Sequence, residues 1–202
     1  ADNSIKSVAY LKGKKIAYPF STCDNLLVVY ALNKAGLKES DIQSVDTTPE
    51  NVASVLAAGA SAGATYEPSI TKILKMGGGK KYHNLVTSKD APGLITDVLY
   101  FNQSYIDKNP EVVRAVIKGY LDGLQYIKDK PTEARKLIAK FMSSSDAEVK
   151  AQQDGAYNIP AYEMSSYFVK RDDFKSLYKV ADMINDILIK RGQIKTGVKA
   201  VD

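Results

Sequence analysis

Short apolar segments alternate with segments of helical periodicity through residues 15–92. The candidate strands are residues 15–18, 43–47, 62–66 and 84–87. Helix starts and stops separate them: Thr48 and Pro49 form a cap followed by proline at the first helical position, and Gly36 and Gly59 follow the last apolar residues of two helices. Because short links between alternating strands and helices produce βαβ units, the sequence predicts an α/β fold with a mostly parallel sheet.

The second half of the chain has a different character. Residues 95–101 are a long apolar segment that predicts one strand, and everything after it is helical in pattern. Pro110 and Pro131 each start a helix, and a last helix is expected over residues 172–190. We therefore expect an α/β lobe over residues 1–92 and a second region, residues 93–202, of one strand plus helices that need a sheet or other helices to cover them.

Composition excludes several classes of protein. The 202 residues carry a net charge of +5, but residues 1–101 have 11 Lys/Arg against 9 Asp/Glu and residues 102–202 have 17 against 14. This even spread argues against a nucleic-acid partner, which requires a concentrated basic face. One Cys and one His exclude an internal disulfide, a Cys-rich zinc site and a His cluster, so we expect no metal and no cofactor. No run approaches the ~20 apolar residues of a membrane-spanning helix.

Two local patterns suggest chemistry that the rest of the chain does not support. Gly77-Gly78-Gly79-Lys80-Lys81 lacks the spacing and the Ser/Thr of a phosphate-binding loop, so a helix stop is the better interpretation. Cys23 stands at an expected helix start, and a catalytic pair with His83 is conceivable. A buried, inert thiol and a histidine at the surface or a strand end are the simpler interpretation.

Hydroxyl and aromatic side chains follow the expected strands. Ligands of open α/β sheets bind beyond the carboxyl ends of the strands. The residues at these positions are Tyr18, Phe20, Ser21, Thr22, Thr47, Thr48, Thr65, Tyr66 and Glu67. The set contains no nucleophile–base pair and no metal cluster, so it predicts a binding cleft rather than an active site.

Each of these residues also has a purely structural interpretation. Ser21 and Thr22 begin a helix whose free N–H groups favour an anionic group, but they can equally be simple helix caps. Tyr66 and Glu67 can belong to the core and to the charged rim, respectively. Sequence alone leaves both interpretations open.

Longer stretches of the chain resemble a known family. They include "SIKSVAYLKGKKIAYPFST", "ALNKAGLKESDI", "TPENVASVLAAG", "ATYEP", "DAPGLITDVLYFNQSYIDKNPEVVRAVIKGYLDGLQYI" and "PTEARKLIAKFM". Together they are similar to the solute-binding proteins of nitrate/sulfonate/taurine-type ABC importers, a family that also includes thiamine-precursor binders. The resemblance covers nearly the whole chain, and it is the combination of motifs that is specific.

The resemblance implies a two-lobed, periplasmic-binding-protein-like (type II) clamp. Residues 1–92 correspond to its second lobe and residues 93–202 to part of its first lobe, whose opening part has no counterpart here. The family's helix-start ligand contact falls on Ser21 and Thr22. Its Trp-Glu-Pro element falls on Tyr66-Glu67-Pro68, with Tyr in place of Trp, and its lobe-crossing segment falls on residues 90–97, which adds Asp97 to the candidate ligand contacts.

The function implied is that of a non-enzymatic binding subunit. It would hold a small anionic or polar organic molecule between the lobes, outside the cytoplasmic membrane (periplasmic or extracellular, with a lipid anchor as one arrangement), and deliver it to an ABC permease. Two alternatives stay open: a pyrimidine-precursor-synthesising enzyme on the same fold, which needs reactive His and Cys residues in its cleft, and a periplasmic ligand-sensing domain. We also expect the chain by itself to bind ligand weakly and to self-associate through exposed helix faces that include Val113, Ile117 and Leu121.

Overall fold

A computed structural model describes residues 1–199 of the chain. The contacts within the chain define two compact units. The first contains Ala1–Thr96 together with the described residues from Ser166 onward, and the second contains Asp97–Ser165. Each unit is described by itself below, and the division of a complete clamp into lobes near residue 92 stays a prediction.

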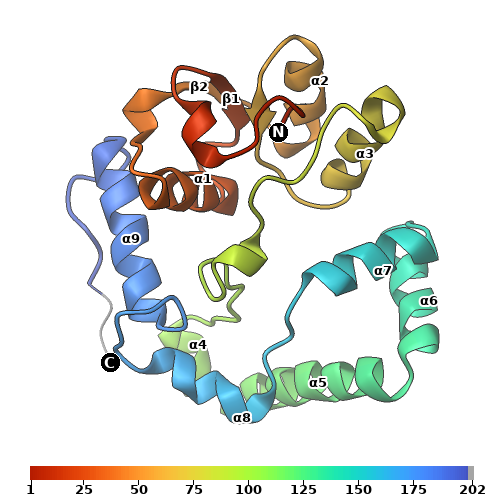
Figure 1. The fold of residues 1–202 in the computed structure, drawn as a ribbon. Coiled ribbons are helices and arrows are strands. Elements are labelled where there is room, and N and C mark those ends of the chain that lie inside the picture. Colours follow the sequence, from red (N-terminus) through yellow and green to blue (C-terminus); the bar gives the residue numbers. More distant parts are fainter. Residues whose placement is uncertain (200–202) are drawn as a thin grey trace. The chain divides into compact units, whose positions relative to one another are not determined.

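A parallel sheet of three strands forms the centre of the first unit (Figure 1). The strands are β1 (Lys15–Tyr18), β2 (Gln43–Asp46) and β3 (Ala62–Gly63), in the order β2-β1-β3. Ile16 is opposite Ser44 on one side and Ala62 on the other, and both pairings are parallel. The predicted α/β fold with parallel pairing of the first strands is therefore confirmed.

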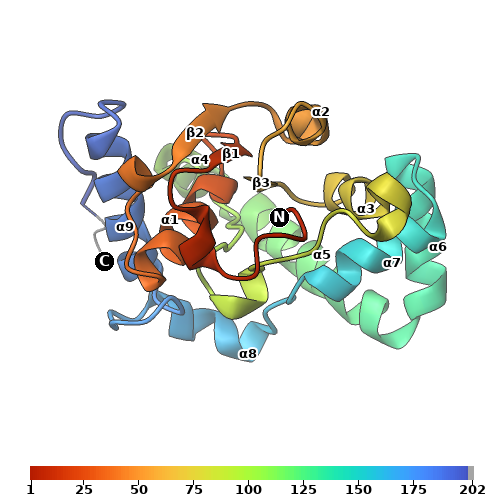
Figure 2. The same cartoon turned by 45° about the horizontal axis from the view of Figure 1, so that its top comes forward.

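The alternation of side chains along β1 builds a core on each face of the sheet. Ile16 and Tyr18 pack in one cluster with Leu32 of α1 (Cys23–Lys34). Ala17, between them, packs in the other cluster with Val52 of α2 (Val52–Ala57). Successive residues of a strand point to opposite faces, so the short segment KIAY is covered by helices on both sides, and α1 and α2 lie apart in the turned view (Figure 2).

The approach of α2 to the sheet depends on Gly63. A Cβ at this position would lie 2.5 Å from Cγ1 of Val52 and 3.1 Å from the carbonyl oxygen of Ala17. Because real Cβ atoms do not approach so closely, only glycine lets the end of β3 pack directly under α2.

Further short elements complete this unit. They are η1 (Val8–Leu11), η2 (Glu39–Asp41), η3 (Pro49–Asn51), α3 (Ser69–Lys75), η4 (Met76–Gly79), η5 (Ser88–Asp90), η6 (Ser165–Phe168, which begins at the junction) and α9 (Leu177–Lys190). The Gly77–Gly79 stretch follows α3, as the helix-stop interpretation predicts. The last helix begins at Leu177 rather than at the predicted Asp172.

The expected fourth strand at residues 84–87 was wrong. The backbone groups of residues 82 and 83, just before this segment, are bonded to the N-terminal residues. Asp2 forms an antiparallel bridge with Tyr82, and His83 donates its N–H to the carbonyl of Ala1 over 2.9 Å. Asp2 also donates its N–H to the carbonyl of Ser61, just before β3. Residues 1–3 thus join the end of the chain segment at 81–83 to the sheet, and residues 84–87 form no ladder.

The expected strand at residues 95–101 was also wrong. The segment has no ladder pairing, and Leu99 and Tyr100 are 57% and 83% accessible, whereas Ile95 and Phe101 are half-buried. A strand exists only when a second strand supplies hydrogen-bond partners, and none of the described residues does so here.

The second unit is helical. Its helices are α4 (Gln103–Lys108), α5 (Pro110–Asp129), α6 (Pro131–Met142), α7 (Asp146–Gly155) and α8 (Ala161–Met164). The predicted starts are confirmed, since Pro110 and Pro131 are the first residues of their helices. Ser145 caps α7 and forms a capping box with Glu148. Of the expected exposed face of α5, Ile117 is 45% accessible, whereas Val113 is buried and Leu121 half-buried.

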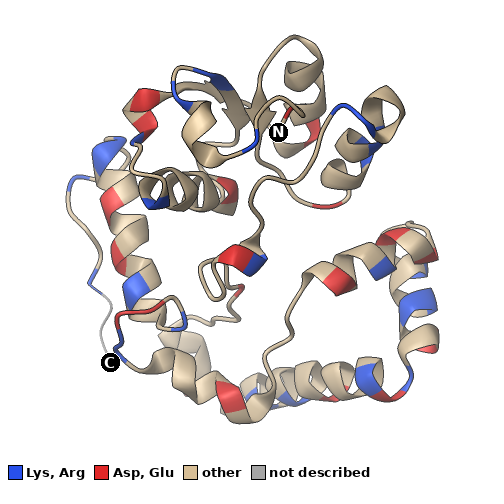
Figure 3. Ribbon diagram, in the orientation of Figure 1, with Lys and Arg blue, Asp and Glu red and all other residues tan. Residues whose placement is uncertain are grey.

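Charged residues of both signs are interspersed in both units (Figure 3). On the second unit, Lys118 pairs with Asp122 and Lys150 with Asp154, each four residues apart on an exposed helix face. Across residues 1–199, we find no helix with the length and apolar character needed to traverse a bilayer.

Candidate functional site

The carboxyl ends of the three strands meet at one edge of the sheet, and the loops that follow are joined there by hydrogen bonds. The N–H of Phe20, after β1, donates to Oδ1 of Asp46, the last residue of β2, over 3.0 Å. The hydroxyl of Thr65, after β3, donates to the carbonyl of Pro49 over 3.1 Å. The structure therefore assembles the segments that follow β1, β2 and β3 into one edge, which we call the carboxyl edge.

Thr22 is the helix cap of α1. Its Oγ1 accepts the N–H of Asp24 over 3.3 Å and donates to Oδ2 of the same residue over 2.9 Å. The hydroxyl is thus used within the first turn, whereas Ser21 is exposed. Of the two residues, Ser21 has the more accessible hydroxyl for a ligand.

Asp24 modifies the electrostatics of this helix start. The residue is 5% exposed, and burial raises the pKa of its carboxyl above the ordinary value, although the hydrogen bond from Thr22 acts in the opposite direction. The N–H groups at the start of a helix favour negative charge. A nearby carboxylate competes with an anionic ligand for that position, so protonation of Asp24 favours an anion there.

Tyr18 lies in the core and not at the surface of the edge. It is 0% exposed, and its hydroxyl donates to Oε1 of Glu39 over 2.5 Å and pairs with Oγ of Ser44 over 2.8 Å. Burial and the Glu39 carboxylate raise the pKa of Tyr18. This placement does not support the predicted ligand contact of Tyr18, because its ring has no accessible surface.

Tyr66 and Glu67 differ in their surroundings. Tyr66 is 49% exposed, so its ring is available at the edge. Oε2 of Glu67 accepts the N–H of Thr71 in the first turn of α3 over 3.1 Å. Glu67 therefore stabilises the start of α3, and its contact with a ligand stays a prediction.

The remaining predicted ligand contacts are residues of intermediate or high exposure. Thr47 follows β2 and is half-buried, like Phe20 and Thr65. Asp97 is exposed and is the first residue of the second unit. Its part in a common site therefore stays a prediction.

Sequence reasoning missed three residues behind the carboxyl edge. The guanidinium carbon of Arg191, which follows α9, lies 4.1 Å from the centroid of the Phe20 ring. Arg191 donates from Nη2 to Oε1 of Glu39. Asp46 could have been found as the last residue of an expected strand, but Arg191 carries no local signal, since it is 152 residues away from Glu39.

Cys23 and His83 are attached to different parts of the first unit. Cys23 is the first residue of α1 and half-buried. Nδ1 of His83 lies 3.0 Å from Oδ1 of Asn3, and the N–H of His83 donates to the carbonyl of Ala1. The next residue, Asp2, is bonded to Ser61, which directly precedes β3. Within residues 1–199, the structure contains no group of three or more His, Cys, Asp or Glu side chains arranged to hold a metal ion.

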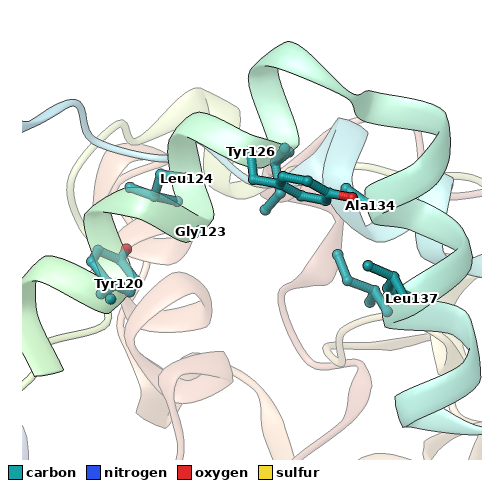
Figure 4. Close-up of a pocket in the computed structure, with 9 residues that line it drawn as sticks. Tyr120, Gly123, Leu124, Tyr126, Ala134 and Leu137 are labelled. Carbon is teal, nitrogen blue, oxygen red and sulfur yellow. The ribbon is translucent and has the colours of Figure 1, made fainter.

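A separate hollow lies in the second unit, between α5 and α6. It measures about 340 Å³, and Figure 4 shows Tyr126 of α5 and Ala134 and Leu137 of α6 at its walls. Its lining consists of glycine, aliphatic and tyrosine residues. No Asp, Glu, His, Lys or Arg side chain lines it, so it offers a mostly apolar surface with two tyrosine side chains.

Comparison with solved structures finds the same fold in binding proteins. The periplasmic aliphatic sulphonate binding protein SsuA of Escherichia coli matches with a TM-score of 0.69 and 20% identity, over 96% of this chain and 59% of that chain. The alkanesulfonate-binding protein SsuA of Xanthomonas axonopodis pv. citri, bound to MOPS, matches with a TM-score of 0.58 and 21% identity, over 81% and 57% of the two chains.

Sequence comparison agrees with the structural one. A protein of Escherichia coli (strain K12), provisionally named an aliphatic sulfonates-binding protein, is 29% identical over 146 residues, which are 70% of this chain and 44% of that protein. A provisionally named binding protein of Brucella abortus (strain 2308) is 26% identical over 167 residues, or 81% and 52%. The chain spans about half the length of these relatives. The model of the NMT1/THI5-like family matches residues 1–134, and the chain therefore belongs to the NMT1/THI5-like family.

Proposed function

We propose that this chain belongs to the extracytoplasmic solute-binding subunit of an ABC importer, and that it forms one wall of a cleft for a small anionic or polar organic molecule. The observation that carries the proposal is the similarity of fold over 96% of the chain to a sulphonate-binding protein. The carboxyl edge supports it, because exposed Ser21 and Tyr66 lie where open α/β sheets bind ligands.

The chemistry of the carboxyl edge suits an oxyanion with a short organic group. Ser21 offers a hydroxyl at the start of α1, where backbone N–H groups favour negative charge. Phe20 and Tyr66 offer aromatic surface for the organic part. A sulfonate combines these two features, so a small alkanesulfonate is the first ligand class to test, followed by nitrate and aromatic acids.

The proposed partner is a membrane permease, and the proposed location is outside the cytoplasmic membrane. Both follow from the binding role, since such a subunit delivers its ligand to a transporter. Two-lobed clamps enclose a ligand from both sides and commonly bury ~70–90% of its surface. Three of the relatives match 81% or more of this chain, but the chain spans only 52–59% of their own length. We therefore expect this wall alone to bind roughly a thousandfold more weakly than a closed clamp.

The enzyme alternative would require Cys23 and His83 to act together. Cys23 follows the carboxyl end of β1, whereas His83 is bonded to residues 1–3 near Ser61, at the level where β1 begins. Three residues of strand separate these levels by ~10 Å. This placement favours the binding role over a paired Cys–His chemistry.

A thermal-shift screen tests the proposal. The chain is heated with ethanesulfonate, MOPS, nitrate, aromatic acids or pyrimidines, and its midpoint of unfolding is followed. A ligand at 100 times its Kd stabilises the folded state by about 2.7 kcal/mol. We expect a concentration-dependent rise with at least one sulfonate and no consumption of ligand by mass spectrometry. Turnover of a pyrimidine precursor would contradict the proposal in favour of the enzyme.

A further inference from the structure

The geometry points to Arg191 as a positioning residue of the carboxyl edge: its guanidinium group fixes the ring of Phe20, and Glu39 fixes the guanidinium group. The inference rests on the proposed function, because it assigns a binding role to the edge on which Phe20 lies. It adds a residue from the far end of the chain that no sequence pattern connects with the edge.

The ring of Phe20 lies against a cation and a second aromatic ring. The guanidinium carbon of Arg191 is 4.1 Å from its centroid, well inside the ~6 Å range of cation–π attraction. The ring of Tyr18 is 5.1 Å away at 51°. Since Tyr18 is immobilised in the core, the ring of Phe20 has one fixed wall, and Arg191 supplies another.

Arg191 is itself held by a shared carboxylate. Oε1 of Glu39 accepts from Nη2 of Arg191, from the hydroxyl of Tyr18 over 2.5 Å and from Nδ2 of Asn25 over 3.4 Å. The side chains of Arg191 and Glu39 are 15% and 32% exposed. An ion pair shielded to this degree and supported by further donors is more constrained than an exposed surface pair.

The backbone on each side of this contact is also fixed. The N–H of Phe20 is bonded to Asp46, and the N–H of Arg191 is bonded to the carbonyl of Ile187 over 3.0 Å as the cap of α9. A cation is favoured at the carbonyl end of a helix. The aromatic ring and the cation are therefore presented to each other by two anchored chain segments.

The consequence for binding is a pre-organised edge. When a ligand contacts Phe20, little conformational entropy is lost, because the ring is already held in place. Groups that are ordered before binding raise the affinity. If Arg191 is removed, Phe20 keeps its backbone position but loses one wall of its ring. The affinity for a ligand at the carboxyl edge should then fall while the fold persists.

Fluorine NMR tests the contact directly. The chain has five phenylalanines, so labelling with para-fluorophenylalanine gives a small set of signals, and Phe20→Leu identifies the signal of residue 20. Arg191→Met keeps most of the aliphatic stem and removes the cation, and we expect it to shift or broaden this signal alone. Arg191→Lys retains a positive charge and should partly restore it. Lys190→Met removes a neighbouring exposed charge from α9 and is the matched control.

Titration with ethanesulfonate, followed through the same signal, tests the positioning role. We expect Arg191→Met to raise Kd about threefold to tenfold, with Lys190→Met unchanged and Arg191→Lys intermediate. An unmoved Phe20 signal in Arg191→Met, or an unchanged Kd despite a moved signal, overturns the inference. If Arg191→Met does not fold by circular dichroism, Arg191→Lys and Glu39→Gln decide the same two points. If ethanesulfonate does not bind the unsubstituted chain, the proposed ligand class is wrong. The Arg191 contact is then judged by the fluorine signal alone, and an unmoved Phe20 signal in Arg191→Met overturns it.

Discussion

The backbone N–H of Phe20 donates to Oδ1 of Asp46 over 3.0 Å, and this bond joins the segment after β1 to the end of β2. Asp46 is exposed, so the bond competes with water and its net contribution is modest. We expect Asp46→Ala to lower the free energy of unfolding by about 1 kcal/mol and Asp46→Asn, which keeps an acceptor oxygen, to lower it less. Urea unfolding measures both variants, and equal losses in the two would contradict the account of this bond.

The capping and the ligand roles at the start of α1 can be separated by substitution. Thr22→Ala removes the side-chain cap and should cost about 1 kcal/mol of stability, whereas Thr22→Ser should cost less. Ser21→Ala touches no cap and should change stability by less than about 0.5 kcal/mol, while it weakens ligand binding. Denaturant unfolding and calorimetric titration are run on the same three proteins. Loss of stability in Ser21→Ala without loss of affinity would reverse the assignment.

Asp24 should make the protein less stable as pH rises above the ordinary Asp range. Burial raises the folded pKa of Asp24 above the ordinary value of 3.8. Between 3.8 and the raised value the folded state binds more protons than the unfolded state, so the free energy of unfolding falls as pH rises through this window. Asp24→Asn removes this dependence and should be more stable than the parent at pH 7, with the difference vanishing at the acid end.

Asp90 supplies the control of opposite sign. Its pKa is lowered, chiefly by the hydrogen bond from the N–H of Thr87, which is 2.8 Å from Oδ2. Its contribution to stability is present above the ordinary pKa and is lost as pH falls through the lowered one. Asp90→Asn should therefore be less stable than the parent at pH 7. Urea unfolding across the acid range should show diverging profiles for the two variants, and parallel profiles would contradict the assignments.

The exposed apolar side chains of the second unit should cause self-association. On α5, Ile117 is 45% and Tyr120 50% accessible, and on α6 Phe141 is 90% accessible. Large apolar side chains exposed to this degree favour association with other apolar surface. We expect light scattering to show concentration-dependent oligomers, and Ile117→Glu combined with Phe141→Glu to reduce them. A chain that is monomeric at all concentrations would contradict this expectation.

The sequence predicted the elements whose signals are local. The prolines at 110 and 131 mark helix starts through their own geometry, and both starts are confirmed. The strand at 15–18 is also confirmed, because β2 and β3 supply its hydrogen-bond partners. The strands expected at 84–87 and 95–101 depended on partners far along the chain, and the described residues do not supply them. Pairing is a property of two segments, so an apolar run alone cannot establish it.

The candidate site shows the same division. Phe20, Ser21 and Thr22 follow β1 and Thr65 follows β3, so parallel strands bring them to one edge, and their ligand contacts stay a prediction. The strand ends did not reveal that Tyr18 faces the core, since this depends on which side of β1 is covered by α1. Nor could they reveal Arg191, which reaches Phe20 only through the packing of α9 in the first unit.

We propose that the carboxyl edge binds a small sulfonate or a related anion. The most direct test of this proposal is an NMR titration of the isotope-labelled chain with ethanesulfonate at millimolar concentrations, in which every backbone amide is followed. We predict saturable shifts that cluster at Phe20, Ser21, Thr22 and Tyr66. Shifts confined to the hollow between α5 and α6, or no saturable shift at any residue, would contradict the claim.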